Sequence, residues 1–158
     1  MTLRYHTPLS PTEQTTLGIA TPQTLALADR VRYAELDILQ HVNNKSYMGW
    51  FETLRVAHFH RFCAHHFQDG GSPRMVLRNA NMQFIREMVM GEDYVATARV
   101  AAFRNTSYTL EQQLWAGDLR ATLTAVMVLL APTGSGRLPL PQSLRQQFQL
   151  SEGATSDA

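Results

Sequence analysis

The sequence predicts an α+β domain in which an antiparallel β-sheet curls around one long α-helix packed on one of its faces. Three observations support this class. Residues 44–66 contain no proline and, from residue 50 on, no glycine, which predicts the helix. A single strand-like segment, residues 25–33, precedes it. Four later segments are rich in Val, Tyr, Phe and Thr or alternate between apolar and polar residues, and they predict the rest of the sheet: 75–85, 93–104, 107–115 and 119–131.

Length and composition indicate how the chain is organised. A chain of 158 residues with 44% apolar residues fits one domain with one core. Residues 1–23 are rich in Thr, Pro and Gln, and we expect them to form a flexible N-terminal segment. The single domain is expected over residues 24–148. A flexible C-terminal tail is expected over residues 149–158, which are mostly small and polar.

Charge and hydropathy argue against several classes of protein. The net charge is +1 and the arginines are scattered, so there is no basic stripe of the kind that binds nucleic acids. The N-terminus lacks the apolar run of a secretory signal, and the most apolar run, residues 121–131, is too short to span a membrane. Cys63 is the only cysteine, which excludes an intramolecular disulfide and agrees with a reducing compartment. We therefore expect a cytoplasmic location.

The first strand and the helix show different apolar patterns. Leu25, Leu27, Val31 and Tyr33 alternate with smaller or polar residues, as in a strand with one buried face, although Asp29 interrupts the pattern. The helix is expected to begin with a cap at Asn43 or Asn44. Its apolar residues cover more than one narrow stripe, so we expect it to be wrapped on several sides.

Turn signals separate the remaining elements. A loop containing glycine and proline, residues 69–73, is expected to end the helix. Residues 105–106 and 116–118 are expected to form hairpin turns. The turn-rich segment 132–141 is then expected to lead into a short amphipathic helix around residues 143–148.

The segment between the first strand and the helix gathers chemically active side chains. Asp37, His41, Asn43 and Asn44 lie within eight positions. A packed core would have to supply each of these groups with a buried hydrogen-bond partner, whereas a loop beside a cleft can use all of them. The sequence therefore predicts a functional site at this loop.

The order of elements and the string from Asp37 to Glu52 together resemble the hotdog fold and, within it, the thioesterase family typified by 4-hydroxybenzoyl-CoA thioesterase. The string has the family's acid, its His-Val-Asn-Asn turn, and a helix opening with Tyr47 and Trp50-Phe51. The resemblance covers about residues 25–140. It implies an antiparallel sheet wrapped around one long central helix, and an enzyme that hydrolyses acyl-CoA, or an acyl carrier protein thioester, without a cofactor. It also implies a homodimer or a dimer of dimers, with sheets paired edge to edge and each site built across the interface.

The resemblance assigns roles to individual residues. Asp37 acts either as the general base for water or as a nucleophile that forms a mixed anhydride. The backbone N–H of Asn44 contributes to the oxyanion hole at the helix N-terminus. His41 orients Asp37, contacts the substrate or carries a proton. Four residues are assigned to substrate binding: Asn43, Tyr47, Arg86 and Glu87. The arginines that are candidates for the CoA phosphates are Arg74, Arg78, Arg86 and Arg104.

One position departs from a second group of relatives. The loop is also similar to that of plant acyl-ACP thioesterases, in which Asp, Asn and His cooperate at alternate positions and Glu87 has a counterpart near the active site. Here the middle position is Leu39. This departure favours a CoA-type site in which the aspartate works with backbone donors.

Other residues have simpler explanations. The four histidines of the helix face different sides and lack a carboxylate at ligand spacing, so no metal site is expected. Cys63 is expected to be a small core residue, and Glu52 to pair with Arg55 one turn on. No Gly-x-Ser-x-Gly motif or phosphate-binding glycine loop is present. Two alternatives remain open: a hotdog enoyl-thioester hydratase or dehydratase, and a non-catalytic acyl-thioester binding protein.

Overall fold

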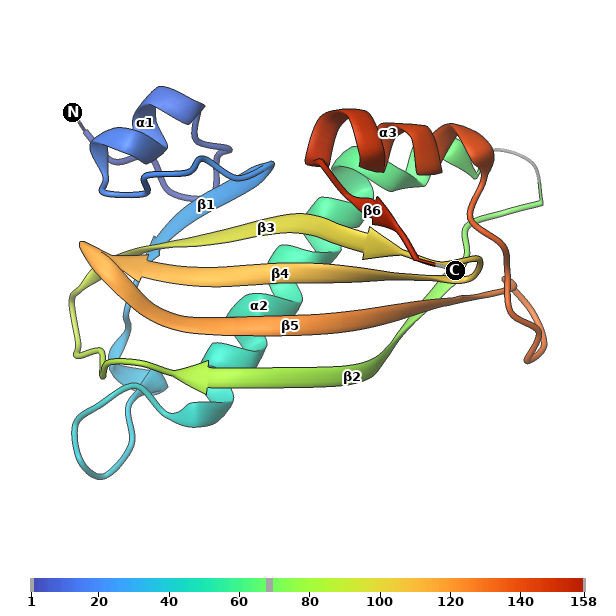
Figure 1. The fold of residues 1–158 in the computed structure, drawn as a ribbon. Helices are drawn as coiled ribbons and strands as arrows, with labels where there is room; N and C mark the ends of the chain where they lie inside the picture. Colours follow the sequence, from blue (N-terminus) through green and yellow to red (C-terminus); the bar gives the residue numbers. More distant parts are fainter. Residues whose placement is uncertain (1, 68–69, 158) are drawn as a thin grey trace.

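The computed structural model describes residues 2–67 and 70–157 and contains one sheet that covers one long helix (Figure 1). The elements in chain order are α1 (Pro11–Thr16), β1 (Leu25–Arg30), a 3₁₀ turn (Tyr33–Glu35), α2 (Asn44–His58), β2 (Arg74–Phe84), β3 (Asp93–Phe103), β4 (Ser107–Ala116), β5 (Asp118–Leu130), α3 (Gln142–Glu152) and β6 (Thr155–Ser156). No helix in the described part of the chain is long and apolar enough to cross a membrane.

The sheet has the strand order β1-β3-β4-β5-β2, and all neighbours in this order are antiparallel. The short strand β6 pairs with the end of β3 in parallel. Strands β2 to β5 start and end within one residue of the segments predicted from sequence. Since β3, β4 and β5 are joined by tight turns, they form a three-stranded meander, and α2 lies across one face of the sheet (Figure 1). Strand β2 precedes them in the chain but pairs with β5 and not with β3. The predicted α+β arrangement is confirmed.

The predicted long helix changes its winding along its length. It begins as α2, continues as a π-helical turn over Phe59–Cys63 and ends as a 3₁₀ turn over Ala64–His66. The N–H of Phe59 is shared between the carbonyls of Arg55 and Val56 at this change. Position 69 of the predicted loop lies outside the described residues, and Gly70 and Gly71 have the positive φ angles that favour glycine.

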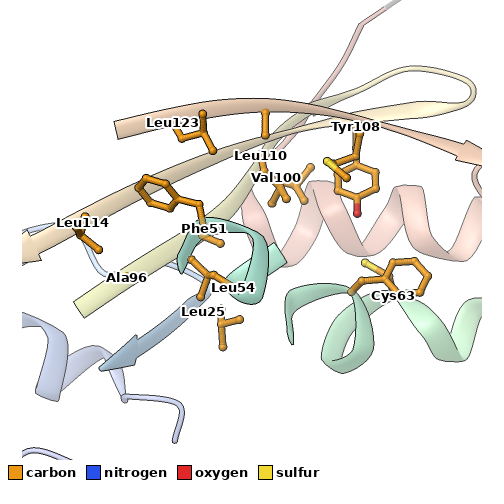
Figure 2. Packing of buried hydrophobic residues seen from close by; sticks show 14 of the residues in the cluster. Leu25, Phe51, Leu54, Cys63, Ala96, Val100, Tyr108, Leu110, Leu114 and Leu123 are labelled. Carbon is orange, nitrogen blue, oxygen red and sulfur yellow. The ribbon is translucent and has the colours of Figure 1, made fainter. Parts of the chain in front are cut away.

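The core lies between α2 and the concave face of the sheet (Figure 2). Phe51 and Leu54 of α2 are almost fully buried, and each such side chain contributes about 2 kcal/mol through removal from water. They face apolar residues that alternate along the central strands: Ala96, Val100, Leu110, Leu114 and Leu123. Cys63 is also fully buried, and this burial raises the pKa of its thiol well above its ordinary range. It is therefore a core residue, as the sequence predicts.

The N-terminal segment packs on the domain, which differs from the flexible segment expected over residues 1–23. Helix α1 has a complete capping box between Ser10 and Glu13. Leu9 and Ile19 are buried against the outward face of β1, so this strand is buried on both faces rather than one. The sequence did not predict this packing because a helix of six residues is too short to show a periodic pattern. The apolar residues that anchor it, Leu9 and Ile19, lie before and after the helix.

The C-terminal segment also packs, in contrast to the tail expected from residue 149. Helix α3 continues to Glu152, and Gly153 ends it with a φ of 68°. The Glu152 side chain is buried, lies 3.0 Å from Nε2 of His58 and accepts a hydrogen bond of 2.8 Å from the Val100 N–H. From sequence Glu152 looks like an exposed residue of a polar tail. Its burial could not be predicted, because both of its partners come from distant parts of the chain.

We expect Glu152→Ala to lower the free energy of unfolding by about 3 kcal/mol, because it leaves His58 and the Val100 N–H buried without a partner. The matched control is Glu111→Ala, which removes a half-exposed carboxylate paired with Arg99 and should cost much less. Chemical denaturation of both variants measures the difference. Equal losses would mean that the buried pair does not hold α3 to the domain.

Candidate active site

The loop of residues 36–43 is closed by its own backbone. Leu36 and Val42 form an antiparallel bridge, and the Asp37 N–H donates to the His41 carbonyl at 2.7 Å. Oδ1 of Asp37 accepts hydrogen bonds from the N–H groups of Leu39, at 2.8 Å, and His41, at 3.3 Å. Gln40 adopts a φ of 65° to complete the turn. The half-buried Asp37 carboxylate is thus held through one oxygen.

The second oxygen of Asp37 has no hydrogen-bond donor among residues 2–67 and 70–157. It is available to a water molecule or a substrate. Leu39 contributes to the site through its backbone N–H, while its side chain is 70% exposed. Backbone donors thus contact Asp37, and its action with them in a CoA-type site stays a prediction.

Helix α2 begins where this loop ends. Asn43 is its N-cap, and its side chain accepts a hydrogen bond from the Lys45 N–H at 3.1 Å. Asn44 is the first helical residue, and no hydrogen bond within the described chain uses its N–H. The positive end of the helix dipole adds to this free donor. The helix N-terminus can therefore stabilise a negative charge.

A solvent-open hollow of about 220 Å³ lies between the loop, the start of α2 and the end of β2. Its lining contains six of the seven candidate residues and three apolar ones: Asp37, His41, Asn44, Tyr47, Arg86, Glu87, Val42, Phe84 and Ile85. Asn43 is the exception, because its side chain caps the helix instead. In Figure 1 the 36–43 loop lies beside the arrowhead of β2, so the hollow is at one end of the sheet.

His41 and Glu87 face each other across the hollow. Nδ1 of His41 lies 3.4 Å from a carboxylate oxygen of Glu87, and both side chains are partly exposed. Their backbones are joined nearby, since His41 and Val89 form an antiparallel bridge and the Val42 N–H donates to the Met88 carbonyl at 2.8 Å. His41 and Glu87 are therefore close enough to form an ion pair when the imidazole is protonated.

Aromatic side chains form one wall. Tyr47 is buried, and this burial raises the pKa of its hydroxyl. The centroid of its ring lies 5.3 Å from that of Phe84 and 5.4 Å from that of Trp50, and both pairs pack edge to face. Phe84 and Ile85 are more than half exposed. Sequence reasoning missed these two residues because they read as the ordinary end of an alternating strand.

The arginines proposed for CoA phosphates are not brought together. Arg86 lines the hollow, and its guanidinium is paired with Asp118 at 2.7 Å. Arg74 donates to the carbonyls of Ala131 and Gly134. Arg78 and Arg104 line a separate hollow of about 310 Å³.

The predicted ion pair between Glu52 and Arg55 is wrong. No ion pair joins these residues in the described chain, and Arg55 is buried and donates to Oε1 of Gln112 at 3.1 Å. The helix spacing is suitable for a surface pair, but the Arg55 side chain turns toward the sheet, where Gln112 supplies an acceptor. Glu52 stays exposed on α2, outside the hollow.

Comparisons with known proteins show the family and the fold of this chain. The family model described as the thioesterase-like superfamily matches residues 31–148. A thioesterase-superfamily structure from Jannaschia sp. CCS1 is 41% identical, with 99% of this chain and 100% of that chain covered and a TM-score of 0.89. No match is found among curated proteins.

Two more distant structures share the fold. A thioesterase from Thermus thermophilus, complexed with coenzyme A and Zn, is 24% identical over 83% of this chain and 96% of that chain, with a TM-score of 0.70. A 1,4-dihydroxy-2-naphthoyl-CoA thioesterase from Synechocystis is 14% identical over 78% of this chain and 93% of that chain, with a TM-score of 0.65.

The family match spans most of the domain, including the 36–43 loop and all of α2. The sheet wrapped around one long helix is the hotdog fold that the resemblance implied. This chain belongs to the thioesterase-like superfamily.

Proposed function

We propose that this protein is an acyl-CoA thioesterase that hydrolyses an acyl-CoA thioester to the free acid and CoA. One observation carries the proposal: the same hollow is lined by Asp37, which has one free carboxylate oxygen, and by Asn44, which has an unused N–H. Thioester hydrolysis requires a nucleophile or base near the carbonyl carbon and a donor for the developing oxyanion. These two groups supply both requirements.

The reaction has two routes that use the same groups. As a general base, Asp37 takes a proton from water while the resulting hydroxide adds to the carbonyl carbon, and the tetrahedral oxyanion then expels the CoA thiolate. As a nucleophile, Asp37 attacks the carbonyl, the thiolate leaves, and water hydrolyses the mixed anhydride. In both routes the Asn44 N–H stabilises the oxyanion. His41, held by Glu87, is placed to protonate the leaving thiolate.

The choice of CoA rests on family relatives. The Thermus thermophilus thioesterase is complexed with coenzyme A, the Synechocystis protein is a thioesterase for a CoA ester, and both share the fold. The aromatic wall of Tyr47 and Phe84 supplies an apolar surface for the acyl group beside Asp37. Arg86, which lines the hollow and is paired with Asp118, is the proposed contact for a phosphate of CoA.

We propose that the active form is a dimer joined along β2. This strand is an edge of the sheet, and of its 11 residues only Met75 and Met82 are partly buried. The opposite edge is covered, because the N–H groups of His6 and Leu9 donate to β1. A long exposed edge strand that carries apolar side chains favours pairing with another strand. The hollow lies at the end of β2, so a second subunit there would help to close it.

Replacing Asp37 by Asn removes the base or nucleophile while keeping an oxygen for the loop hydrogen bonds. We expect kcat to fall by about a hundredfold or more, with the melting temperature nearly unchanged. Thiol release from a panel of short, long, branched and aromatic acyl-CoAs measures this effect, and Asp157→Asn, outside the hollow, is the control. A folded Asp37→Asn protein with parental rates would refute the assignment. Turnover of enoyl-CoA without thiol release would indicate a hydratase.

Two substitutions of Asn44 separate its backbone from its side chain. Asn44→Pro removes the N–H but suits the first helical position, and Asn43 already has the extended backbone that precedes proline. Asn44→Ala keeps the N–H. We expect Asn44→Pro to lower kcat by about a hundredfold and Asn44→Ala to retain most activity, as measured by thiol release. Equal effects of the two changes would exclude an oxyanion role for the amide.

The dimer is tested with matched charge substitutions. Val76 on β2 is 41% exposed and Leu150 on α3 is 87% exposed. We expect Val76→Glu to shift the protein toward monomers and to lower activity in parallel, whereas Leu150→Glu leaves both unchanged. Sedimentation velocity over a range of concentrations, combined with thiol release, measures both effects. Full activity in a monodisperse monomer contradicts the proposal.

A further inference from the structure

One arginine outside the hollow is buried and makes an unusual number of contacts. Arg120 is the third residue of β5, and only 8% of its side chain is exposed. Its guanidinium donates to both carboxylate oxygens of Glu92, at 3.0 and 3.2 Å, and to Asp118 at 2.6 Å. It also donates to the carbonyls of Glu87, at 2.8 Å, and Ala116, at 3.0 Å. Such a set uses the planar fork of five donors that only arginine has.

These contacts form a charged cluster of alternating sign: Arg86, Asp118, Arg120 and Glu92. The hydrogen bond from Arg120, followed by that from Arg86, holds the pKa of the Asp118 carboxyl below its ordinary value. One end of the cluster is at the hollow, because Arg86 lines it. The other end is Glu92, which also accepts a hydrogen bond from the Val89 N–H at 2.9 Å.

The cluster holds the segment of residues 85–92, whose first three residues line the hollow. The N–H groups of Ile85 and Arg86 donate to the Arg120 carbonyl, at 2.9 and 3.2 Å. The guanidinium holds the Glu87 carbonyl in the middle of the segment and the Glu92 side chain at its end. A single residue thus fixes the start, middle and end of the 85–92 segment.

The 85–92 segment in turn meets the loop that carries Asp37. Its Met88 carbonyl accepts the Val42 N–H, and its Val89 bridges His41. Glu87 then faces His41 at 3.4 Å. Met88 is fully buried and anchors the segment in the core independently of charge. Met88 therefore keeps the segment on the domain when Arg120 is replaced, while Arg120 determines how firmly the Glu87 backbone is held.

We propose that Arg120 is a positioning residue for the reaction: it holds the Glu87 backbone so that the Glu87 carboxylate stays opposite His41 and the 36–43 loop keeps its place beside Asn44. This inference rests on the proposed thioesterase function. The alignment of reacting groups is sensitive to displacements of about 1 Å, which can cost a hundredfold in rate. Arg120 thereby acts on kcat without touching the substrate.

The test compares three variants in the full chain. Arg120→Gln removes the charge and most of the donors, and Arg120→Lys keeps the charge but not the fork. Arg145→Gln is the matched control, because Arg145 also fastens backbone, donating to the carbonyls of Leu140 and Asn105, but lies outside the hollow. Glu92→Gln, which removes the paired carboxylate of the cluster, replaces Arg120→Gln if that variant does not fold. Hydrogen exchange of the Val42 and Val89 amides reports how often their hydrogen bonds to Met88 and Glu92 open, without reference to activity.

We expect exchange of both amides to quicken about tenfold in Arg120→Gln, less in Arg120→Lys, and not at all in Arg145→Gln. Over the same series kcat should fall by about tenfold or more, with a smaller change in KM. Unchanged exchange in the Arg120 variants, or equal losses of kcat in Arg145→Gln, overturns the proposal. If the parent releases no thiol from any acyl-CoA, the proposed function fails, and the exchange rates still decide whether Arg120 positions the segment.

Discussion

The closed turn between Asp37 and Asn44 is the constraint on which the candidate site depends. Its hydrogen bonds hold one oxygen of Asp37 against the backbone of Leu39 and His41 and leave the other oxygen free. The same turn ends at the Asn43 cap, which starts α2 with an unused N–H at Asn44. A carboxylate and an anion-stabilising donor therefore share one hollow because of local backbone geometry, before any long-range packing is considered.

Long-range packing supplies what the turn lacks. Helix α2 is fixed by Phe51 and Leu54 in the concave face of the sheet, so its N-terminus has a defined position at the end of β2. The 85–92 segment follows β2 directly and returns against the 36–43 loop through Met88 and Val89. The charged cluster around Arg120 then connects β5 to that segment. The core thus fixes the position of α2, and the 85–92 segment fixes the position of the Glu87 side chain opposite His41.

Much of the fold and of the candidate site could be predicted from sequence, wherever the residues that determine a feature are close together in the chain. The β2 to β5 strands alternate clearly, and the 37–52 string lies in one continuous stretch, so the sheet, the start of the helix and the Asp37, His41 and Asn44 candidates were within reach. Terminal packing was missed because Leu9, Ile19 and Glu152 gain their partners from distant segments. The Arg55 pairing was wrong for the same reason, since Gln112 competes from the sheet. The role of Arg120 has no sequence signal, because a single arginine in a strand reads as a surface charge.

The central claim is that Asp37 and the Asn44 amide act on the same carbonyl group. A double-mutant cycle with Asp37→Asn and Asn44→Pro, measured as kcat/KM for thiol release from the best acyl-CoA, tests it most directly. If both groups serve one transition state, the double variant should lose little more than the more damaged single variant. Losses that multiply, or a double variant as active as the parent, would contradict the account.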